Sequence, residues 1–252
     1  MNIIFHPAFY DVYDSDPAAA PGRMEPIIRE LKKHSQYKII APDPANEKDL
    51  LRAHSAEHID FIRRSWCIYN MAILSAGGAI KTAELAFAEE PSFGCIRPPG
   101  HHASANSCWG FCFFNNMAVS LLKLKAEGKI ASAFVLDFDL HRGDGNINIL
   151  SDNEGFKILN STAKDERDYL LAITSALEVA GDCDIIAASA GFDGYVKDWG
   201  RKLSTQAYKE IGTMMKTFSE MSCRGRRYAL LEGGYYYEDL GINIHAFCEG
   251  LW

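Results

Sequence analysis

Short runs of β-branched, aromatic and aliphatic residues recur along this chain, separated by stretches with helical periodicity. Strands joined through helices run parallel in one sheet, so this alternation predicts an α/β fold with helices on both faces of the sheet. Parallel strands are buried on both faces, which suits apolar runs such as Ile185–Ser189. No internal repeat, low-complexity tract or linker interrupts the pattern, and we expect one domain over residues 1–252.

The element boundaries follow from the same patterns and from capping residues. Strands are expected at Asn2–Phe5, Tyr37–Ile40, Ser92–Ile96, Ala133–Asp137, Phe156–Leu159, Ile185–Ser189 and Tyr228–Leu231. Helices are expected at Met24–Lys33, Ala56–Arg64, Ile68–Ala88, Asn116–Ala126, Asp165–Val179, Thr205–Met221 and Tyr237–Phe247. Gly128 lies where a C-terminal cap would end the helix that begins at Asn116.

Composition excludes several classes of protein. A net charge of −7 argues against a nucleic-acid binder, which is normally basic. No apolar run is long enough to span a bilayer, and the N-terminus lacks the pattern of a signal peptide. The seven cysteines form no Cys-x-x-Cys pair, which is typical of reduced thiols in a cytoplasmic protein rather than of a zinc ribbon.

The stretch Val135–Gly145 carries the strongest chemical signal, because an apolar strand runs directly into several acids and a histidine. Side chains alternate faces along a strand, so Asp137, Asp139 and His141 project the same way. Placing three ionisable groups on one face is costly unless they bind something. Asp144 alone would be explained as a turn residue, but Asp139 and His141 would not, because apolar residues are interleaved with them. We interpret the stretch as part of a metal site.

Three other expected strands also end in polar residues. The loop Arg97–Ala103 delivers His101 and His102 after one strand, held by two prolines and a glycine. Asp193 follows another strand, and Glu-Gly-Gly-Tyr235 follows the last. Singly, Asp193 is most typical of a turn and Gly-Gly-Tyr of a tight turn before a packed aromatic residue. Because ligands bind beyond the carboxyl ends of parallel strands, the four signals together favour one site.

The combined set has the composition of a catalytic metal site. Asp139, His141 and Asp193 offer two oxygens and one nitrogen, which leaves a coordination position open for a water or a substrate. Zinc suits this ligand set, although the ligand types also allow iron or cobalt. A metal of this kind polarises a carbonyl group and lowers the pKa of its water to roughly 7.

The remaining polar residues could supply the other parts of an amide hydrolase. His101 and His102 could transfer protons, each oriented by a carboxylate such as Asp137 or Asp144. Tyr235 could donate a hydrogen bond to a developing oxyanion, which contributes roughly 3 kcal/mol in comparable sites.

Six motifs, in order along nearly the whole chain, resemble the histone deacetylase family, which includes bacterial acetylpolyamine amidohydrolases. Pro21–Met24 also resembles the entry to that family's first helix. The motifs are Arg97–Ala103, Gly110–Asn116, Asp137–His141, Gly143–Gly145, Ser189–Asp193 and Leu231–Tyr235.

The resemblance implies a fold and a cofactor. The fold would be the three-layer arginase/deacetylase fold, a single α/β domain around an eight-stranded parallel sheet, one strand more than the seven expected above. One zinc ion per chain would be bound by Asp139, His141 and Asp193. A potassium ion close to the zinc would contact backbone oxygens near Asp137, Asp139 and His141.

The resemblance also implies roles for individual residues. His102 would be the general base, supported by Asp144, and His101 its electrostatic partner, held by Asp137. Tyr235 would polarise the scissile carbonyl. Gly110 and Phe111 would line the acyl channel, and Arg23 would lie near the internal acetate exit.

The chain departs from the family pattern between Gly145 and Ser189, where it has only 43 residues. Many relatives have a long glycine-rich insertion there, with a phenylalanine that faces the match of Phe111. We therefore expect an open site, whose missing wall a neighbouring subunit of a homo-oligomer could supply. Three aromatic residues could also replace part of it, although core packing explains them equally well: Trp109, Tyr195 and Trp199.

The expected function is zinc-dependent deacetylation of an N-acylated amine, such as acetyl-lysine or an acetylpolyamine, in a small molecule or a peptide. We expect no nucleic-acid or membrane partner. Two alternatives share the fold. A manganese ureohydrolase needs an acid two positions after the histidine, where this chain has Gly143. A non-catalytic, small-molecule-sensing protein would be favoured by loss of a metal ligand or of the tyrosine, and all are present.

Overall fold

Seven parallel strands form the central sheet of the protein, in a computed structural model that describes residues 1–252. The order is β2-β1-β3-β7-β6-β4-β5. The strands are β1 (Asn2–Ile4), β2 (Lys38–Ile40), β3 (Ser92–Gly94), β4 (Ala133–Asp137), β5 (Phe156–Asn160), β6 (Ile185–Ala190) and β7 (Arg227–Leu231). The α/β class and all seven expected strands are confirmed. The eight-stranded sheet implied by the resemblance is wrong for this chain, because each apolar run forms one strand and no run is left for another.

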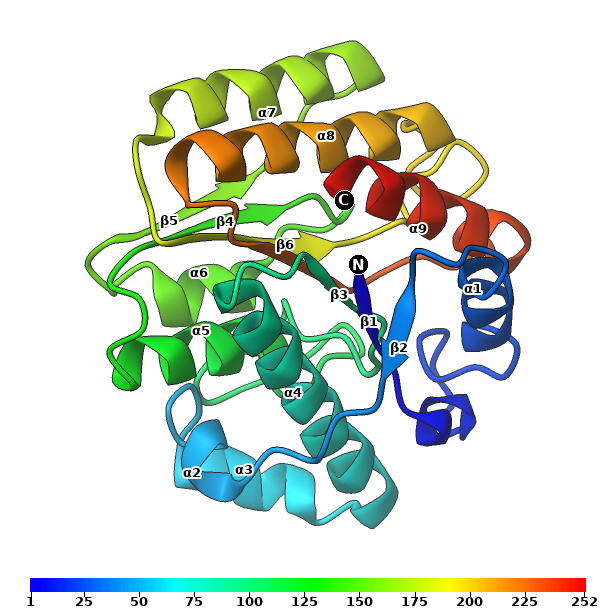
Figure 1. Cartoon of the computed structure of the whole chain (residues 1–252). Helices are drawn as coiled ribbons and strands as arrows, with labels where there is room; N and C mark the ends of the chain where they lie inside the picture. The colour runs from blue at the N-terminus through cyan, green and yellow to red at the C-terminus, as the bar shows by residue number, and fades with distance from the viewer.

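Helices cover both faces of the sheet (Figure 1). One layer holds α1 (Met24–Leu31), α7 (Glu166–Ala180), α8 (Thr205–Ser222) and α9 (Tyr237–Leu251). The opposite layer holds α4 (Trp66–Phe87), α5 (Asn116–Ala126) and α6 (Asp144–Leu150), with α2 (Glu47–Leu50) and α3 (Ala56–Arg63) outside it. A short 3₁₀ helix, η1, covers Pro7–Tyr10. No helix combines the length and the apolar composition that crossing a bilayer requires.

Two short helices, α2 and α6, were not expected from the sequence. Both span two turns or fewer, which is too short for a 3.6-residue periodicity to show. The side chain of Asn46 caps α2 by accepting a hydrogen bond from Asp49 N. Asp144, which the sequence placed in a turn, is the first residue of α6. Gly128 has a φ of +69° just after α5, as its expected capping position requires.

The four strands whose ends carry chemical motifs are consecutive neighbours in the sheet: β3, β7, β6 and β4. Asp137 pairs in register with Ser189, and Ala190 pairs with Leu231, so these strands end at nearly the same level. Every residue of β4 and β6 is buried. The sheet therefore presents four loops side by side at its carboxyl edge.

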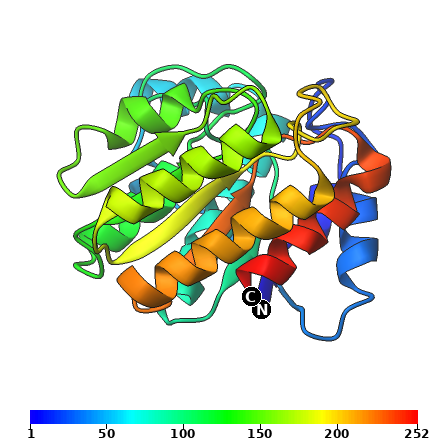
Figure 2. The same ribbon diagram turned by 90° about the horizontal axis from the view of Figure 1, so that it is seen from above.

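The two chain termini lie side by side (Figure 2). Arg227, at the start of β7, links the C-terminus to the sheet by donating hydrogen bonds to the carbonyl groups of Leu251 and Trp252. This arrangement keeps the termini away from the loops at the carboxyl edge.

Candidate active site and metal centre

The three predicted metal ligands converge at the carboxyl ends of β4 and β6. His141 Nδ1 lies 3.2 Å from Asp139 Oδ1 and 3.1 Å from Asp193 Oδ2. One ligand atom from each residue lies within 4.8 Å of the other two. The two carboxylates are buried, whereas 43 % of the histidine side chain is exposed, which leaves one side of the cluster open to solvent.

The spacing of these atoms suits one small ion with tetrahedral coordination. Two donors that each lie 2.0–2.1 Å from such an ion are about 3.3 Å from each other, close to both distances measured from His141. Asp193 Oδ2 is also buried without a hydrogen bond. A buried carboxylate oxygen without a hydrogen bond is costly, and an ion at this position would satisfy it.

Without an ion, the cluster has an unusual charge balance. Burial and the neighbouring Asp139 raise the pKa of Asp193 to about 6. A hydrogen bond with Asp139 and the nearby charge of Asp193 raise the pKa of His141 to about 10. A protonated His141 thus supplies the positive charge that these carboxylates need. Metal binding must displace its proton, and therefore weakens as the pH falls.

Two glycines let the backbone approach the ligand Asp139 closely. A Cβ atom on Gly191 would lie 2.2 Å from Asp139 Oδ2, and one on Gly233 would lie 2.6 Å from it. Gly233 N instead donates a hydrogen bond of 2.8 Å to that oxygen. The glycines of the Ala-Gly-Phe-Asp and Glu-Gly-Gly-Tyr motifs are therefore needed for space around the ligand.

His102 is paired with Asp144, as the sequence predicted, at a distance of 2.6 Å between Nδ1 and Oδ1. The other carboxylate oxygen accepts a 2.8 Å hydrogen bond from Trp109 Nε1, and the indole ring lies 3.8 Å from the imidazole, centroid to centroid. Burial and the neighbouring His101 lower the pKa of His102 to about 4. The imidazole is therefore neutral near pH 7 and able to accept a proton.

His101 has the opposite electrostatic environment. Its Nδ1 lies 3.3 Å from Asp137 Oδ2, and its Nε2 lies 3.8 Å from Asp139 Oδ1. Although burial opposes a charge here, Asp139 and Asp137 raise the pKa of His101 well above its ordinary value. Asn146 holds Asp137 from the other side with a hydrogen bond of 3.0 Å. Adjacent histidines with pKa values shifted in opposite directions are typical of a site that both donates and accepts protons.

A cavity of about 120 Å³ opens onto these groups, and Tyr235, Gly110 and Phe111 line it. Burial raises the pKa of Tyr235, which keeps its hydroxyl protonated and able to donate a hydrogen bond. Phe111 has a left-handed φ of +67°, unusual for its type, and its ring contacts that of Tyr235 edge-on at 6.1 Å. A Cβ on Gly110 would lie 2.4 Å from the ring of His102.

Arg23 lies behind Tyr235 and does not line the cavity. Its guanidinium is fully buried, 5.5 Å from the centre of the tyrosine ring. It donates hydrogen bonds to the carbonyl groups of Glu232 and Gly234, while Nη1 has no partner. Arg23 thus holds the loop that carries Tyr235.

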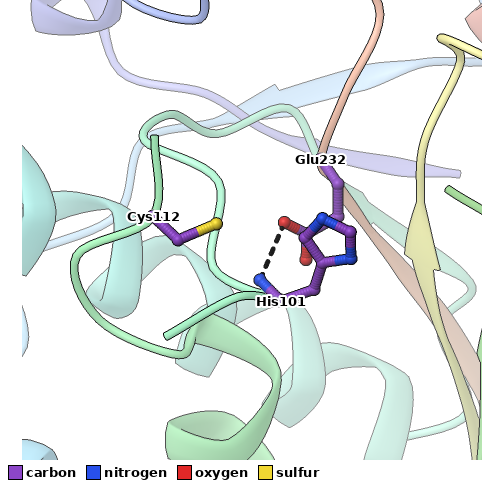
Figure 3. A group of neighbouring side chains, drawn as sticks. All are labelled: His101, Cys112 and Glu232. Atoms are coloured by element: carbon purple, nitrogen blue, oxygen red, sulfur yellow. Dashed lines mark hydrogen bonds between the residues drawn. The ribbon is translucent and has the colours of Figure 1, made fainter. Parts of the chain in front are cut away.

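Glu232 is a buried part of the site for which the sequence predicted no role, although it lies inside the last motif. Its Oε2 accepts hydrogen bonds from Gly100 N at 2.7 Å and from His101 N at 3.2 Å (Figure 3). The thiol of Cys112 lies beside it, and burial raises the pKa of Glu232 to about 7. The carboxyl group thus joins the end of β7 to the loop Arg97–Ala103, which carries His101 and His102 and is called the histidine loop below.

Asp198 was also missed, and no sequence signal marked it. Its Oδ2 accepts hydrogen bonds from Tyr235 N at 2.6 Å and Tyr236 N at 2.8 Å. Its Oδ1 accepts one from Trp199 N at 2.7 Å. One buried carboxylate therefore fixes the loop after β6 to the loop after β7.

Of the three aromatic residues considered for the missing wall, two line the cavity and one does not. Trp109 and Trp199 lie at the cavity, and about half of each side chain is exposed. Tyr195 is buried and donates a hydrogen bond to Asp239 instead. No residue of the short 146–188 segment lines the cavity.

Larger surface hollows exist, including one of about 540 Å³ beside Ser55 and Phe61. We assign the site to the smaller cavity, because only there do the clustered metal-ligand candidates and the paired histidines meet.

The model of the histone deacetylase domain matches residues 18–169, more than half of the chain. This chain belongs to the histone deacetylase family. The matched range contains the histidine loop and the first two metal-ligand candidates, while Asp193 and Tyr235 lie beyond it.

Similar curated proteins span nearly the whole chain. A probable deacetylase of Methanothermobacter thermautotrophicus is 27 % identical, over 99 % of this chain and 90 % of its own length. A probable deacetylase of Archaeoglobus fulgidus is 28 % identical, over 96 % of this chain and 84 % of its own length. The polyamine deacetylase HDAC10 of Danio rerio is 23 % identical, over 93 % of this chain and 45 % of its own length. The first of these alignments has 303 positions against 252 residues here, so that relative has segments that this chain lacks.

The crystal structure of the HDA15 HD domain has the same fold, with a TM-score of 0.86 and 21 % sequence identity. The structural alignment covers 99 % of this chain and 88 % of the HDA15 chain. The two proteins therefore share one fold over nearly the whole of this chain.

Proposed function

We propose that this protein is a zinc-dependent amidohydrolase that removes an acyl group, most simply acetyl, from an N-acylated amine. The observation that carries the proposal is the convergence of Asp139, His141 and Asp193 beside a cavity that Tyr235 and His102 line. Two oxygens and one nitrogen with an open side are the donor set of catalytic zinc. When bound there, zinc would polarise the acyl carbonyl and acidify the attacking water.

The residues around the cavity divide the proton transfers between them. His102 is neutral near pH 7, so it takes a proton from the attacking water, while Asp144 keeps its Nδ1 protonated. The protonated imidazole then passes a proton to the leaving amine. His101 stays positively charged beside Asp137 and stabilises negative charge that develops in the transition state.

Tyr235 completes the oxyanion site. Its phenol is protonated across the physiological pH range, so it can donate a hydrogen bond to the acyl oxygen as that atom gains charge. Asp198 holds its backbone, and Arg23 holds the same loop from behind. Such fixed positioning reduces the reorganisation that the reaction needs.

The proposed substrates are small N-acyl amines, with polyamine deacetylases among the relatives as supporting evidence. The test combines metal content with turnover. Purified protein should bind about one zinc ion per chain and hydrolyse N-acetyl amines. A chelator should abolish hydrolysis, and added zinc should restore it.

The variant His102→Ala should lose activity while keeping its zinc, because this histidine is not among the proposed ligands. His6→Ala, which replaces a histidine outside the site, is the matched control. Zinc-loaded protein that hydrolyses no acetylated amine or acyl ester would overturn the proposal and favour a sensing role.

A ureohydrolase-like site with two manganese ions has less support. The position that would need an additional acid is Gly143, where a Cβ atom would lie 1.9 Å from Asp137 Oδ2. An acidic side chain has no room there. Two metal ions per chain, with urea released from a guanidino substrate, would favour that alternative.

A further inference from the structure

Trp199 lies against the proposed oxyanion donor. Its indole stacks on the ring of Tyr235, with centroids 4.1 Å apart and planes 24° apart, and meets the ring of His141 edge-on. Asp198 fixes its backbone. The side chain is nonetheless 51 % exposed, more than packing against a tyrosine requires.

Trp109 has the equivalent position over the proposed general base. Its indole lies on His102, and its N–H is bonded to Asp144, so the orientation of the ring is fixed. It is 54 % exposed. Two rigid, half-exposed indoles from separate loops thus border one small cavity.

The lining of the cavity offers little to bind a cationic ligand. The only carboxylate in its lining is Asp139, a proposed metal ligand. Both oxygens of Asp144 already accept hydrogen bonds. An ammonium group would therefore find no unpaired carboxylate in the cavity lining.

We propose that Trp109 and Trp199 are specificity-determining residues that bind the amine portion of the substrate by apolar contact. They select N-acyl amines whose amine carries an uncharged alkyl or aryl group. This inference rests on the proposed function and narrows its substrate class away from polyamines.

The test is a series of N-acetyl-n-alkylamines of increasing chain length, with kcat/KM measured for each. Each methylene that becomes buried between the indoles should raise kcat/KM by about two- to fourfold, until the chain extends beyond them. In a plot of log(kcat/KM) against the number of methylenes, the slope reports apolar binding and the intercept reports catalysis. Damage to Tyr235 or His102 in a variant therefore shifts the intercept and leaves the slope unchanged.

Trp199→Ala should reduce the slope to below about 1.5-fold per methylene, and Trp199→Phe should restore most of it. Trp66→Ala, at an exposed tryptophan on α4 outside the cavity, is the matched control and should keep the wild-type slope. A wild-type slope of zero, or an N-acetyl diamine preferred tenfold or more over the alkyl amide of equal length, would overturn the inference.

A second readout does not depend on activity. Binding of N-hexylacetamide to the chelator-treated protein, measured by calorimetry, should be several-fold weaker in Trp199→Ala and unchanged in Trp66→Ala. Equal affinity in both variants would contradict the inference. If zinc-loaded protein hydrolyses nothing, the proposed function fails, whereas hydrolysis that ignores chain length defeats only the role of the indoles.

Discussion

The two edges of the sheet are built from different chemistry. At the carboxyl edge, Asp137, Asp139, Asp193 and Glu232 are buried within one group of loops. At the amino edge, Asp184 is partly exposed, and one of its oxygens accepts hydrogen bonds from the backbone of residues 131 and 132. Asp184 at the amino edge thus ties loops together, whereas the acids at the carboxyl edge also crowd each other.

This difference indicates where the fold gives up stability for function. Crowding and burial raise the pKa values of Asp193 and Glu232, which means that each charged form is unfavourable in the folded chain. At the amino edge, backbone hydrogen bonds help to lower the pKa of Asp184 despite some burial. Perturbed groups gathered at one end of a sheet are typical of a functional site.

The most direct test of the difference between the two edges is to replace one acid at each edge by its amide. Asp139→Asn should lose zinc and lower kcat/KM by at least about 10³-fold, because polarisation of the carbonyl and of the water are lost together. Asp184→Asn should keep its activity and lose about 1 kcal/mol of unfolding free energy. Metal analysis, steady-state kinetics and urea unfolding measure these effects, and zinc-loaded, active Asp139→Asn would contradict the assignment.

Removing one hydroxyl at the carboxyl edge should separate catalysis from stability. Tyr235→Phe should lower kcat by about 10²- to 10³-fold, the usual effect of losing one oxyanion donor, with unfolding nearly unchanged. Tyr236→Phe, at the next residue, is the matched control and should keep full activity. If kcat were the same in Tyr235→Phe and in the wild type, the phenol would have no part in the reaction.

A core truncation at the amino edge should have the reverse effect. Ile185 begins β6 and is fully buried, so Ile185→Ala should lower the unfolding free energy by about 2–5 kcal/mol. Its kcat/KM at a temperature well below the midpoint of unfolding should equal that of the wild type. A large loss of activity in the folded variant would show that the two edges are coupled.

The smallest expected effect depends on pH. Burial raises the pKa of Glu232 from 4.5 to about 7, so the folded chain binds more protons there than the unfolded chain. The stability due to this group is fully present below pH 4.5 and is lost as the pH rises through 7. Glu232→Gln should therefore stabilise the metal-free protein by about 1–3 kcal/mol at pH 8, and by much less at pH 4.5. Urea unfolding at both pH values checks the sign, and an equal change at both would refute it.

Much of the site could be predicted because its residues belong to local motifs. Asp139 and His141 share one strand end, and His101 and His102 share one loop. Local periodicity and turn composition were sufficient to place each motif directly after a strand. Their spacing in the sequence could not show that β3, β7, β6 and β4 are neighbours.

Other residues needed the three-dimensional structure. Asp198 lies in an irregular loop with no motif, and its role follows only from the amide groups of Tyr235 and Tyr236 that point toward it. The sequence does not distinguish Trp199 from Tyr195, yet Trp199 borders the cavity and Tyr195 is buried. Loop side chains follow contacts with distant segments, which local composition does not encode.

The sequence by itself determined the α/β class, the strand positions, and which residue types stand at the strand ends, because hydrophobic periodicity acts over a few residues. Only the tertiary structure decided the order of the strands in the sheet, that Glu232 and Asp198 hold the loops, and that two indoles border the cavity. These features depend on packing between segments up to about 130 residues apart in the chain, and no local pattern specifies such contacts.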